Sequence, residues 1–340
     1  MKNIKNSKKS SFFKKIFIKI SRKLGFEIID QNNFEIITSN KKIGDHLSTL
    51  GRKSINLPLG EVNITRKVKA LDIIIRTCAS VNMLTQNKSR LFEKDKIEYT
   101  IRTINSLLNS SKDPELKKFK INFKIIDHDS SNENLSAIDT VFKKYGKNYS
   151  LINLDVSKFI DKIEKINQRG EKVTNNQISN MANIHQSLFE AKKCEDLIYF
   201  VEDDYIHKKE SLKEMVFTYE RLASQINNEI IICPTDYPYL YAKSEMTQNF
   251  LGQDYHWRKV DETLCTFLTS KKMIEKYWDK YVSMCEKEHS PFEKPLHDIY
   301  ENELCLSPIP SLALHFTNVN SIFGLSPNVN WKKIWDQNGN

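Results

Sequence analysis

The chain has 340 residues, 39% of them hydrophobic and 28% charged, an ordinary composition for a globular protein with one large domain or two modest ones. Its net charge of +9 comes from the first 25 residues, which hold nine Lys or Arg and no acid, so the remaining body is neutral, which argues against an extended nucleic-acid groove. No stretch approaches the roughly 18 consecutive apolar residues that cross a bilayer, and the six cysteines include no CxxC pair, which favours buried thiols in a reducing, cytoplasmic compartment.

The basic residues belong to a predicted amphipathic helix. Over residues 11–24 the apolar side chains share one face of a helical wheel, and the lysines and Arg22 occupy the other. The apolar face consists of Phe12, Phe13, Ile16, Phe17, Ile20 and Leu24. Such a helix suits the surface of an anionic membrane, so we expect residues 1–25 to hold a peripheral protein on the inner membrane face. Packing on the protein's own body is the alternative. Residues 26–67 are expected to form a linker or accessory segment.

From residue 68 onward, β-favouring apolar runs alternate with segments of helical periodicity. We expect strands at 71–77, 119–126, 151–154, 196–201, 230–234 and 263–269, and helices at 96–108, 135–145, 178–193, 212–222 and 273–284. This alternation predicts an α/β fold with a Rossmann-like, mostly parallel central sheet flanked by helices. The predicted domain covers 68–325, with a tail at 326–340. Residues 236–260 are polar and aromatic and are expected to form a long binding loop.

An acidic triplet follows the most apolar strand. Residues 196–201 run without Gly or Pro into Glu202, Asp203 and Asp204. Ligands of open α/β sheets bind at the carboxyl ends of strands, and three acids there need a cation or hydrogen-bond donors. A divalent metal held by carboxylate oxygens is the simplest account. The alternative is a solvated turn whose acids cap the helix that starts near Lys208.

Three motifs in order resemble those of GT-A-fold glycosyltransferases, particularly the large family-2 type. The strand ending in Ile126-Asp127-His128-Asp129-Ser130-Ser131-Asn132 resembles the family's strand end with paired Asp. Ser179-Asn180-Met181-Ala182-Asn183 resembles its Ser-x-Ala-Arg-Asn helix, and Glu202-Asp203-Asp204 falls where the family has its Asp-x-Asp metal motif. The resemblance covers residues 68–320 and implies transfer of a sugar from a nucleotide donor to a glycan or lipid-linked acceptor.

The resemblance also implies roles for single residues. Donor binding is expected from Arg76, Asp127, Asp129, Asn183 and Asp203. Metal binding, of Mn²⁺ or Mg²⁺, is expected from Glu202, Asp204 and His315, because hard oxygen ligands suit both ions and manganese also accepts imidazole.

An inverting single displacement needs a base for the acceptor hydroxyl. The resemblance places this base at a helix start beyond the metal strand, where Asp298 is the best match and Glu301 and Glu262 are weaker candidates. For His315 the alternative is a core histidine, and for Asp298 an ordinary acid of a helix N-terminus.

Departures from the family pattern concern the donor site. Ala182 stands where the family has arginine, so Arg76 or Lys88 is expected to replace that contact. Asp129 replaces a glycine and Glu202 an aspartate. A nucleotidyltransferase and a non-catalytic nucleotide-binding or scaffold protein of the same fold remain alternative functions. An RNA-binding protein is disfavoured by the neutral body.

Overall fold

The computed structural model describes residues 12–26, 62–79, 90–242, 247–317 and 323–339. Contacts divide the chain into two units, one made of Met1–Ile37 and His46–Glu61 and the other of Thr38–Asp45 and Val62–Asn340. The first unit contains α1 (Phe12–Lys23), which confirms the predicted N-terminal helix. Within the described ranges no helix combines the length and the apolarity that a bilayer crossing requires. The second unit holds every other element. Lys88 and most of the predicted linker lie outside the described residues.

A nine-stranded sheet forms the centre of the second unit. Its strands are β1 (Ala70–Thr77), β2 (Lys120–Asp127), β3 (Ser150–Asn153), β4 (Leu197–Glu202), β6 (Ile231–Ile232), β7 (Asn249–Leu251), β8 (His256–Lys259), β9 (Phe267–Ser270) and β10 (Cys305–Ile309), in the order β3-β2-β1-β4-β9-β6-β10-β8-β7. The first four strands of this order run parallel. Beyond β4 the antiparallel β9 enters, and parallel and antiparallel pairs mix. The predicted α/β class with a parallel core is confirmed.

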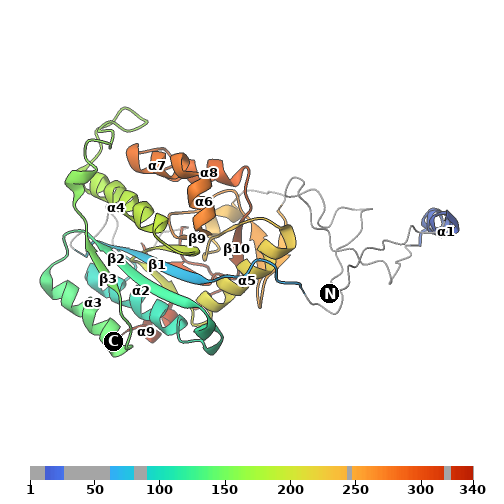
Figure 1. Cartoon of the computed structure of the whole chain (residues 1–340), viewed down its shortest axis with the longest axis horizontal. Coiled ribbons are helices and arrows are strands. Elements are labelled where there is room, and N and C mark those ends of the chain that lie inside the picture. Colours follow the sequence, from blue (N-terminus) through green and yellow to red (C-terminus); the bar gives the residue numbers. More distant parts are fainter. Residues whose placement is uncertain (1–11, 27–61, 80–89, 243–246, 318–322, 340) are drawn as a thin grey trace. The chain divides into compact units, whose positions relative to one another are not determined.

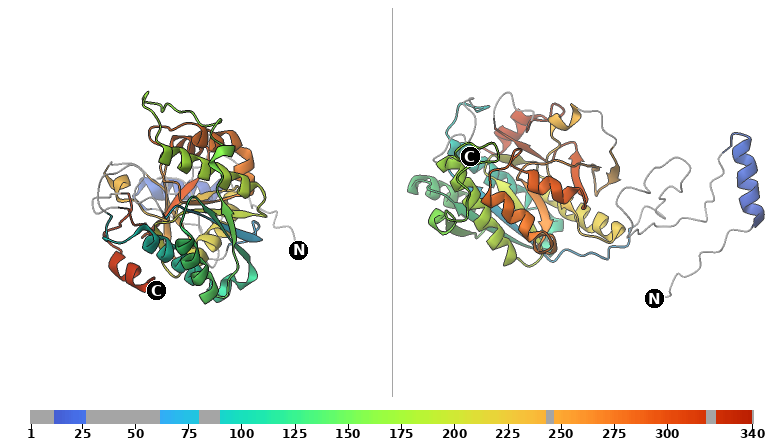
Figure 2. Two further views of the ribbon diagram at one scale, coloured as in Figure 1. Left: turned by 90° about the vertical axis from the view of Figure 1, so that its left-hand side faces the viewer. Right: turned by 90° about the horizontal axis from the view of Figure 1, so that it is seen from above.

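Helices cover both faces of this sheet. They are α2 (Lys96–Ser110), α3 (Asn132–Lys144), α4 (Asn175–Lys192), α5 (Ser211–Ile226), α6 (Lys271–Lys276), α7 (Trp278–Glu286), α8 (Lys294–Tyr300) and α9 (Trp331–Gln337), with the 3-10 helices η2 (Pro114–Lys118), η3 (Val156–Lys158) and η4 (Pro238–Tyr241). In Figure 1, α4, α6, α7 and α8 lie above the sheet and α2, α3 and α9 below it. The left-hand view of Figure 2 shows the same layers.

The central strands are apolar because they are buried on both faces. All eight residues of β1 and the first five of β4 are buried. Parallel strands covered by helices on both sides read as continuous apolar runs, which is why the sequence predicts them well. Five of the cysteines, Cys194, Cys233, Cys265, Cys285 and Cys305, are buried thiols, as predicted.

Several regions of the domain differ from the prediction, among them the helix expected at 273–284, which is divided into α6 and α7. The expected loop at 236–260 contains β7 and β8, which extend the sheet at one edge. Within β8 the Trp257 side chain is fully buried while its neighbour His256 is exposed. A strand of four residues shows too little alternation to be recognised among polar and aromatic neighbours.

The predicted boundary at residue 325 also changes. The C-terminal residues form α9, and its Trp335 stacks on Phe92 with ring centroids 4.1 Å apart. Trp335 also meets Tyr99 of α2 edge-on at 4.7 Å, and Asn105 Nδ2 donates to Asn338 O (3.1 Å). The expected tail is therefore part of the core below the sheet.

At the other boundary, Arg66 ties the start of the domain to the sheet. Its guanidinium pairs with Asp196 (2.5 Å) and Glu229 (3.0 Å), and the backbone N–H groups of Thr65 and Arg66 donate to Ser224 Oγ. The last residues of the predicted linker are thus anchored to the domain.

Candidate active site

Parallel pairing brings the carboxyl ends of β2, β1 and β4 to one edge of the sheet. The strand registers set Thr77 opposite Asp127 and Arg76 opposite Glu202. The acidic triplet then leads into β5 (Tyr205–His207), which pairs with β11 (Ala313–His315) as a separate two-stranded sheet. Backbone topology alone therefore gathers the residues of three distant motifs, including His315, at one place.

Asp127 orders the turn after β2. Its Oδ1 accepts hydrogen bonds from Thr77 Oγ1 (2.6 Å) and Ser130 Oγ (2.7 Å), and its Oδ2 accepts from Ser130 N (3.1 Å). Ser130 Oγ accepts from Ala79 N (3.0 Å), so this turn is linked to the end of β1. Asp129 lies within this turn, with an exposed side chain and a φ of 57°. That left-handed backbone explains why the related motif has glycine here, and Asp tolerates it better than most residues.

Arg76 joins the α4 motif to the acidic triplet. Its Nη1 donates to Asn180 Oδ1 (2.8 Å), and its Nη2 pairs with Glu202 Oε1 (3.0 Å). Asn183 Nδ2 donates to Ile126 O (3.1 Å), whereas its buried Oδ1 has no hydrogen-bond partner within the described part of the chain. A buried amide oxygen without a partner is unusual in a folded protein. Asn183 Oδ1 is therefore a candidate acceptor for a ligand N–H or O–H.

Asp203 is enclosed by protein groups. Its Oδ1 pairs with Lys96 Nζ (2.5 Å), and its Oδ2 accepts from Thr100 Oγ1 (3.0 Å) and Cys78 N (3.3 Å). These partners come from α2 and from the residue after β1. The structure thus places Asp203, a predicted donor-binding residue, in an internal network that joins α2 to the sheet.

Asp204 faces cations on both of its oxygens. Oδ1 lies 3.3 Å from His315 Nε2, while Oδ2 lies 3.3 Å from Arg90 Nη1 and 3.6 Å from Lys96 Nζ. Burial acts to raise the pKa of Asp204, but Lys96, His315 and Arg90 together hold it well below its ordinary value. The carboxylate is ionised throughout the physiological range.

His315 is oriented by three neighbours. Its ring stacks on Tyr205 with centroids 4.4 Å apart, and its Nδ1 lies 3.2 Å from Phe323 O, which leaves Nε2 facing Asp204. Burial lowers the pKa of the imidazole, but the Asp204 carboxylate outweighs burial and raises the pKa above its ordinary value. Gly324 is required at this corner, because a Cβ there would come within 2.0 Å of His315 O.

Two of the three predicted metal ligands, Asp204 and His315, lie side by side and contact each other as an ion pair. Two ligands at about 2.1 Å from one octahedral ion lie about 3 Å apart, close to the 3.3 Å between Asp204 Oδ1 and His315 Nε2. One carboxylate oxygen and one imidazole nitrogen suit Mn²⁺. The third predicted ligand, Glu202, is paired with Arg76. Over the described ranges, no group of three His, Cys, Asp or Glu side chains is arranged to hold a metal ion.

The ion-pair partners of Asp298, the predicted base, are lysines outside this cluster. Its carboxylate pairs with Lys280 (2.9 Å) and, closer still, with Lys294. Hydrogen bonds from Lys294 and Lys280 lower the pKa of Asp298, which makes it a weak base. Glu301, the weaker candidate, is exposed at the end of α8.

Glu293 is the carboxylate that sequence reasoning missed. It directly precedes α8, and burial, reinforced by the negative charge of Glu202, raises its pKa to about 7. The positive charge of His315 acts on it in the opposite direction, so Glu293 lies within the electrostatic reach of both cluster residues. The sequence signal for Glu293 was Pro295, because proline is common in the first turn of a helix. A helix that begins just before Pro295 has Glu293 at its start, whereas Asp298 lies within the helix.

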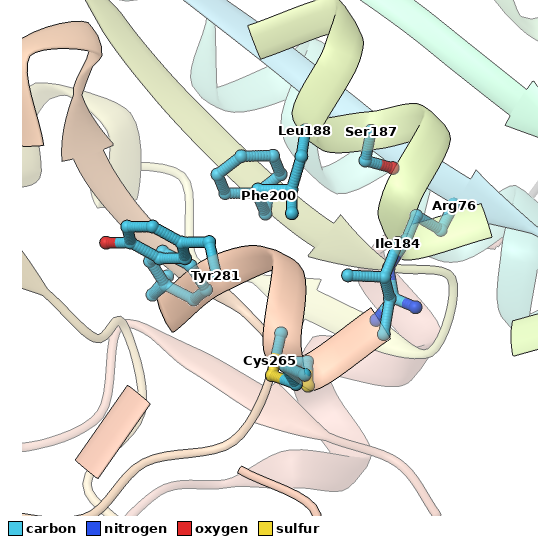
Figure 3. Close-up of a pocket in the computed structure, with 9 residues that line it drawn as sticks. Arg76, Ile184, Ser187, Leu188, Phe200, Cys265 and Tyr281 are labelled. Carbon is cyan, nitrogen blue, oxygen red and sulfur yellow. The ribbon is translucent and has the colours of Figure 1, made fainter. Parts of the chain in front are cut away.

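A small apolar cavity lies beside the cluster, between α4, β4 and α7 (Figure 3). Arg76 lines it together with Ile184, Ser187, Leu188, Phe200, Cys265, Phe267, Tyr281 and Met284. It has room for about one water molecule. A nucleotide or a sugar is far larger, so this cavity is a feature of the packing and the candidate site is the polar cluster at the strand ends.

Comparison with known proteins finds only distant likeness. No protein-family model matches the chain, and no curated protein matches its sequence. Among solved structures, S. aureus TarS is 13% identical with a TM-score of 0.40 over 70% of this chain, which spans 35% of TarS. The galactosyltransferase LgtC with donor and acceptor sugar analogues is 11% identical with a TM-score of 0.38, covering 78% of this chain and 94% of LgtC.

A third similar structure is the mannosyltransferase PcManGT from Pyrobaculum calidifontis with GDP-Man and Mn²⁺. It is 8% identical with a TM-score of 0.34, covering 67% of this chain and 56% of PcManGT. Two of these three structures are sugar transferases, the class that the motifs resemble. None of the three exceeds a TM-score of 0.40, so these likenesses carry no functional conclusion for this chain.

Proposed function

We propose that the chain is a glycosyltransferase that moves a sugar from a nucleotide donor to a glycan or lipid-linked acceptor. The observation that carries the proposal is a pair of carboxylates in opposite environments. Cations hold the pKa of Asp204 low, while burial brings the pKa of Glu293 to about 7. One ionised anchor and one proton acceptor poised near neutrality are what a displacement by a hydroxyl group requires.

In this proposal Asp204 and His315 would hold a divalent ion, Mn²⁺ or Mg²⁺, which would supply Lewis-acid stabilisation for the leaving diphosphate. Glu293 accepts the proton of the acceptor hydroxyl as that oxygen attacks the anomeric carbon, and a single displacement inverts the configuration there. Asp129 and Asn183 Oδ1 offer acceptors for the nucleotide. Arg76 acts indirectly, by positioning Glu202 and Asn180, and Asp127 acts through the turn that carries Asp129.

Nucleotide binding tests this proposal. A nucleoside diphosphate that binds only the folded state stabilises it by about 2.7 kcal/mol at 100 times its dissociation constant. We therefore expect the melting temperature to rise in Mn²⁺ with one member of a panel of UDP, GDP, CDP and ADP. Nucleoside monophosphates of the same bases serve as controls for the diphosphate. A panel that leaves the melting temperature unchanged, with and without metal, contradicts the proposal.

We further propose that α1 attaches the protein to the inner membrane face, where a lipid-linked acceptor resides. Its apolar side chains are exposed in its own unit, with Phe12 at 72%, Phe13 at 80% and Phe17 at 62%. Exposed aromatic rings beside Lys19, Arg22 and Lys23 match an anionic lipid surface in polarity and charge.

Vesicle sedimentation measures this attachment. Replacing Phe12, Phe13 and Phe17 together by Ser is expected to weaken binding to vesicles with anionic lipid at least roughly tenfold, because each buried aromatic side chain contributes about 1.5–3 kcal/mol. Ile166→Ser removes a similarly exposed apolar side chain, 53% exposed, from the other unit and serves as the matched control. Equal binding by the triple variant and the control would contradict the assignment of the surface to α1.

A further inference from the structure

Three long cationic side chains are buried around the acidic triplet. Arg76, Arg90 and Lys96 each expose less than a tenth of the side chain, and each pairs with an acid of the triplet. They come from the end of β1, from the segment before α2 and from the first residue of α2. Burying a cation is costly even when it is paired, so three of them at one edge of a sheet call for a reason beyond stability.

Lys96 and Arg90 occupy one side of Asp204. Both approach Oδ2, whereas His315 approaches Oδ1. A phosphate bound to a metal ion on Oδ1 would therefore also lie near the two cations on Oδ2. Without them, a diphosphate entering here would meet Asp203 and Asp204 with His315 as the remaining cationic partner of the two carboxylates.

Arg90 is held in place by an aromatic cluster. Its guanidinium lies over the Tyr99 ring, 4.8 Å from the centroid, and Tyr99 Oη donates to Phe92 O (2.6 Å). Phe92 in turn stacks on Trp335 of α9. This packing fixes the direction of a side chain that would otherwise be flexible, which reduces the entropy cost of contacting a ligand.

We propose that Lys96 and Arg90 form a diphosphate-binding pair that contacts the phosphoryl oxygens directly. The inference rests on the proposed function. In glycosyltransferases of the resembling type the metal ion compensates the negative charge of the diphosphate, and here Lys96 and Arg90 would take a share of that role. Lysine contributes a compact positive charge and arginine a planar donor set, and both recognise phosphate. A diphosphate then binds measurably without any divalent ion.

Calorimetric titration of inorganic pyrophosphate in excess EDTA tests this pair. Pyrophosphate presents the diphosphate without the nucleoside, so the unknown base does not matter. We expect one saturable site per chain in the wild type. Lys96→Gln and Arg90→Gln should each weaken binding roughly tenfold or more, because each removes a charge-assisted contact. Lys96→Arg, which keeps the charge, should retain most of the affinity.

The matched control is Lys124→Gln. Lys124 also lies between two carboxylates, 3.8 Å from Asp72 and 3.8 Å from Glu190, but it belongs to the middle of β2 and its ammonium group contacts the last turn of α4, not the acidic triplet. The Lys124→Gln variant retains the basic N-terminal residues, so it also controls for unspecific binding of pyrophosphate to residues 1–25. Pyrophosphate affinity in this variant should equal that of the wild type.

Two results would overturn the inference. One is a wild type that binds no pyrophosphate in EDTA, and the other is equal weakening by Lys96→Gln, Arg90→Gln and Lys124→Gln. Circular dichroism and the ligand-free melting temperature show whether each variant folds, and if Lys96→Gln does not fold, the Arg90 variant decides. If the wild type binds a nucleotide in Mn²⁺ but binds no pyrophosphate in EDTA, the proposed transferase function stands and only the assignment of Lys96 and Arg90 as a diphosphate-binding pair is wrong.

Discussion

Glu293→Gln is expected to lower the turnover number roughly a hundredfold to ten-thousandfold, the usual contribution of a positioned general base. Glutamine keeps the size and the hydrogen-bonding shape of the side chain but cannot accept the proton of the hydroxyl group. Donor affinity should change little, since Glu293 faces the acceptor in the proposed reaction. The assay compares turnover with nucleotide affinity in the same preparations.

The pH dependence follows from the raised pKa of Glu293. The ionised form is the active base, so wild-type activity should increase as the pH rises through about 7 and then level off. In the folded protein the proton leaves near pH 7, whereas in the unfolded chain it leaves near pH 4.5. Between these values the folded state binds more protons, so stability decreases as the pH rises.

The same substitution should therefore stabilise the protein at alkaline pH. At pH 8 the free energy of unfolding of Glu293→Gln should exceed that of the wild type by up to roughly 3 kcal/mol, and at pH 4 the two should be similar. Asp298→Asn separates the two candidate bases. If it abolishes activity and Glu293→Gln does not, the base is Asp298 and the assignment of Glu293 is wrong.

Asp204→Asn is expected to lower nucleotide affinity in Mn²⁺ at least roughly a hundredfold. Its carboxylate is the only predicted metal ligand that faces both His315 and the cation pair, and an amide is a far weaker ligand for a hard cation. Titration of Mn²⁺ at a fixed nucleotide concentration measures the effect as a loss of metal affinity.

Asp203→Asn provides the matched comparison one residue away. Asp203 is enclosed by Lys96, Thr100 and Cys78 N, so its substitution should lower stability by roughly 3–5 kcal/mol, the cost of breaking a buried ion pair. Its metal affinity should stay near the wild-type value. Equal loss of metal affinity in the two variants would show that the triplet acts as a unit and would contradict the role given to Asp204 alone.

The parallel half of the fold was predictable because strands that are buried on both faces consist mostly of apolar residues. The runs that became β1 and β4 are apolar enough to be recognised without any context, whereas β2 alternates first and is buried only toward its carboxyl end. The edge strands β7 and β8 were not, since their few residues alternate with polar neighbours. α9 was missed because its core contacts come from two tryptophans in a short polar segment, and their aromatic partners Phe92 and Tyr99 are more than 200 residues away.

The candidate site was predictable to the extent that motifs carry it. Asp204 and His315 meet as expected, but sequence cannot show that Lys96 and Arg90 reach the same carboxylate, because lysines and arginines are abundant and their partners depend on tertiary structure. The base illustrates the same limit. Asp298 and Glu293 are five residues apart, and only the start of α8 and the burial that raises the pKa of Glu293 distinguish them.

The most direct test of sugar transfer is release of a nucleoside diphosphate from a panel of sugar nucleotides in Mn²⁺, with water or added membranes as the acceptor source. The account predicts release from one donor class by the wild type, with strong losses in Asp204→Asn and in Glu293→Gln. No release from any sugar nucleotide by a folded wild-type protein, in Mn²⁺ or in Mg²⁺, would contradict it.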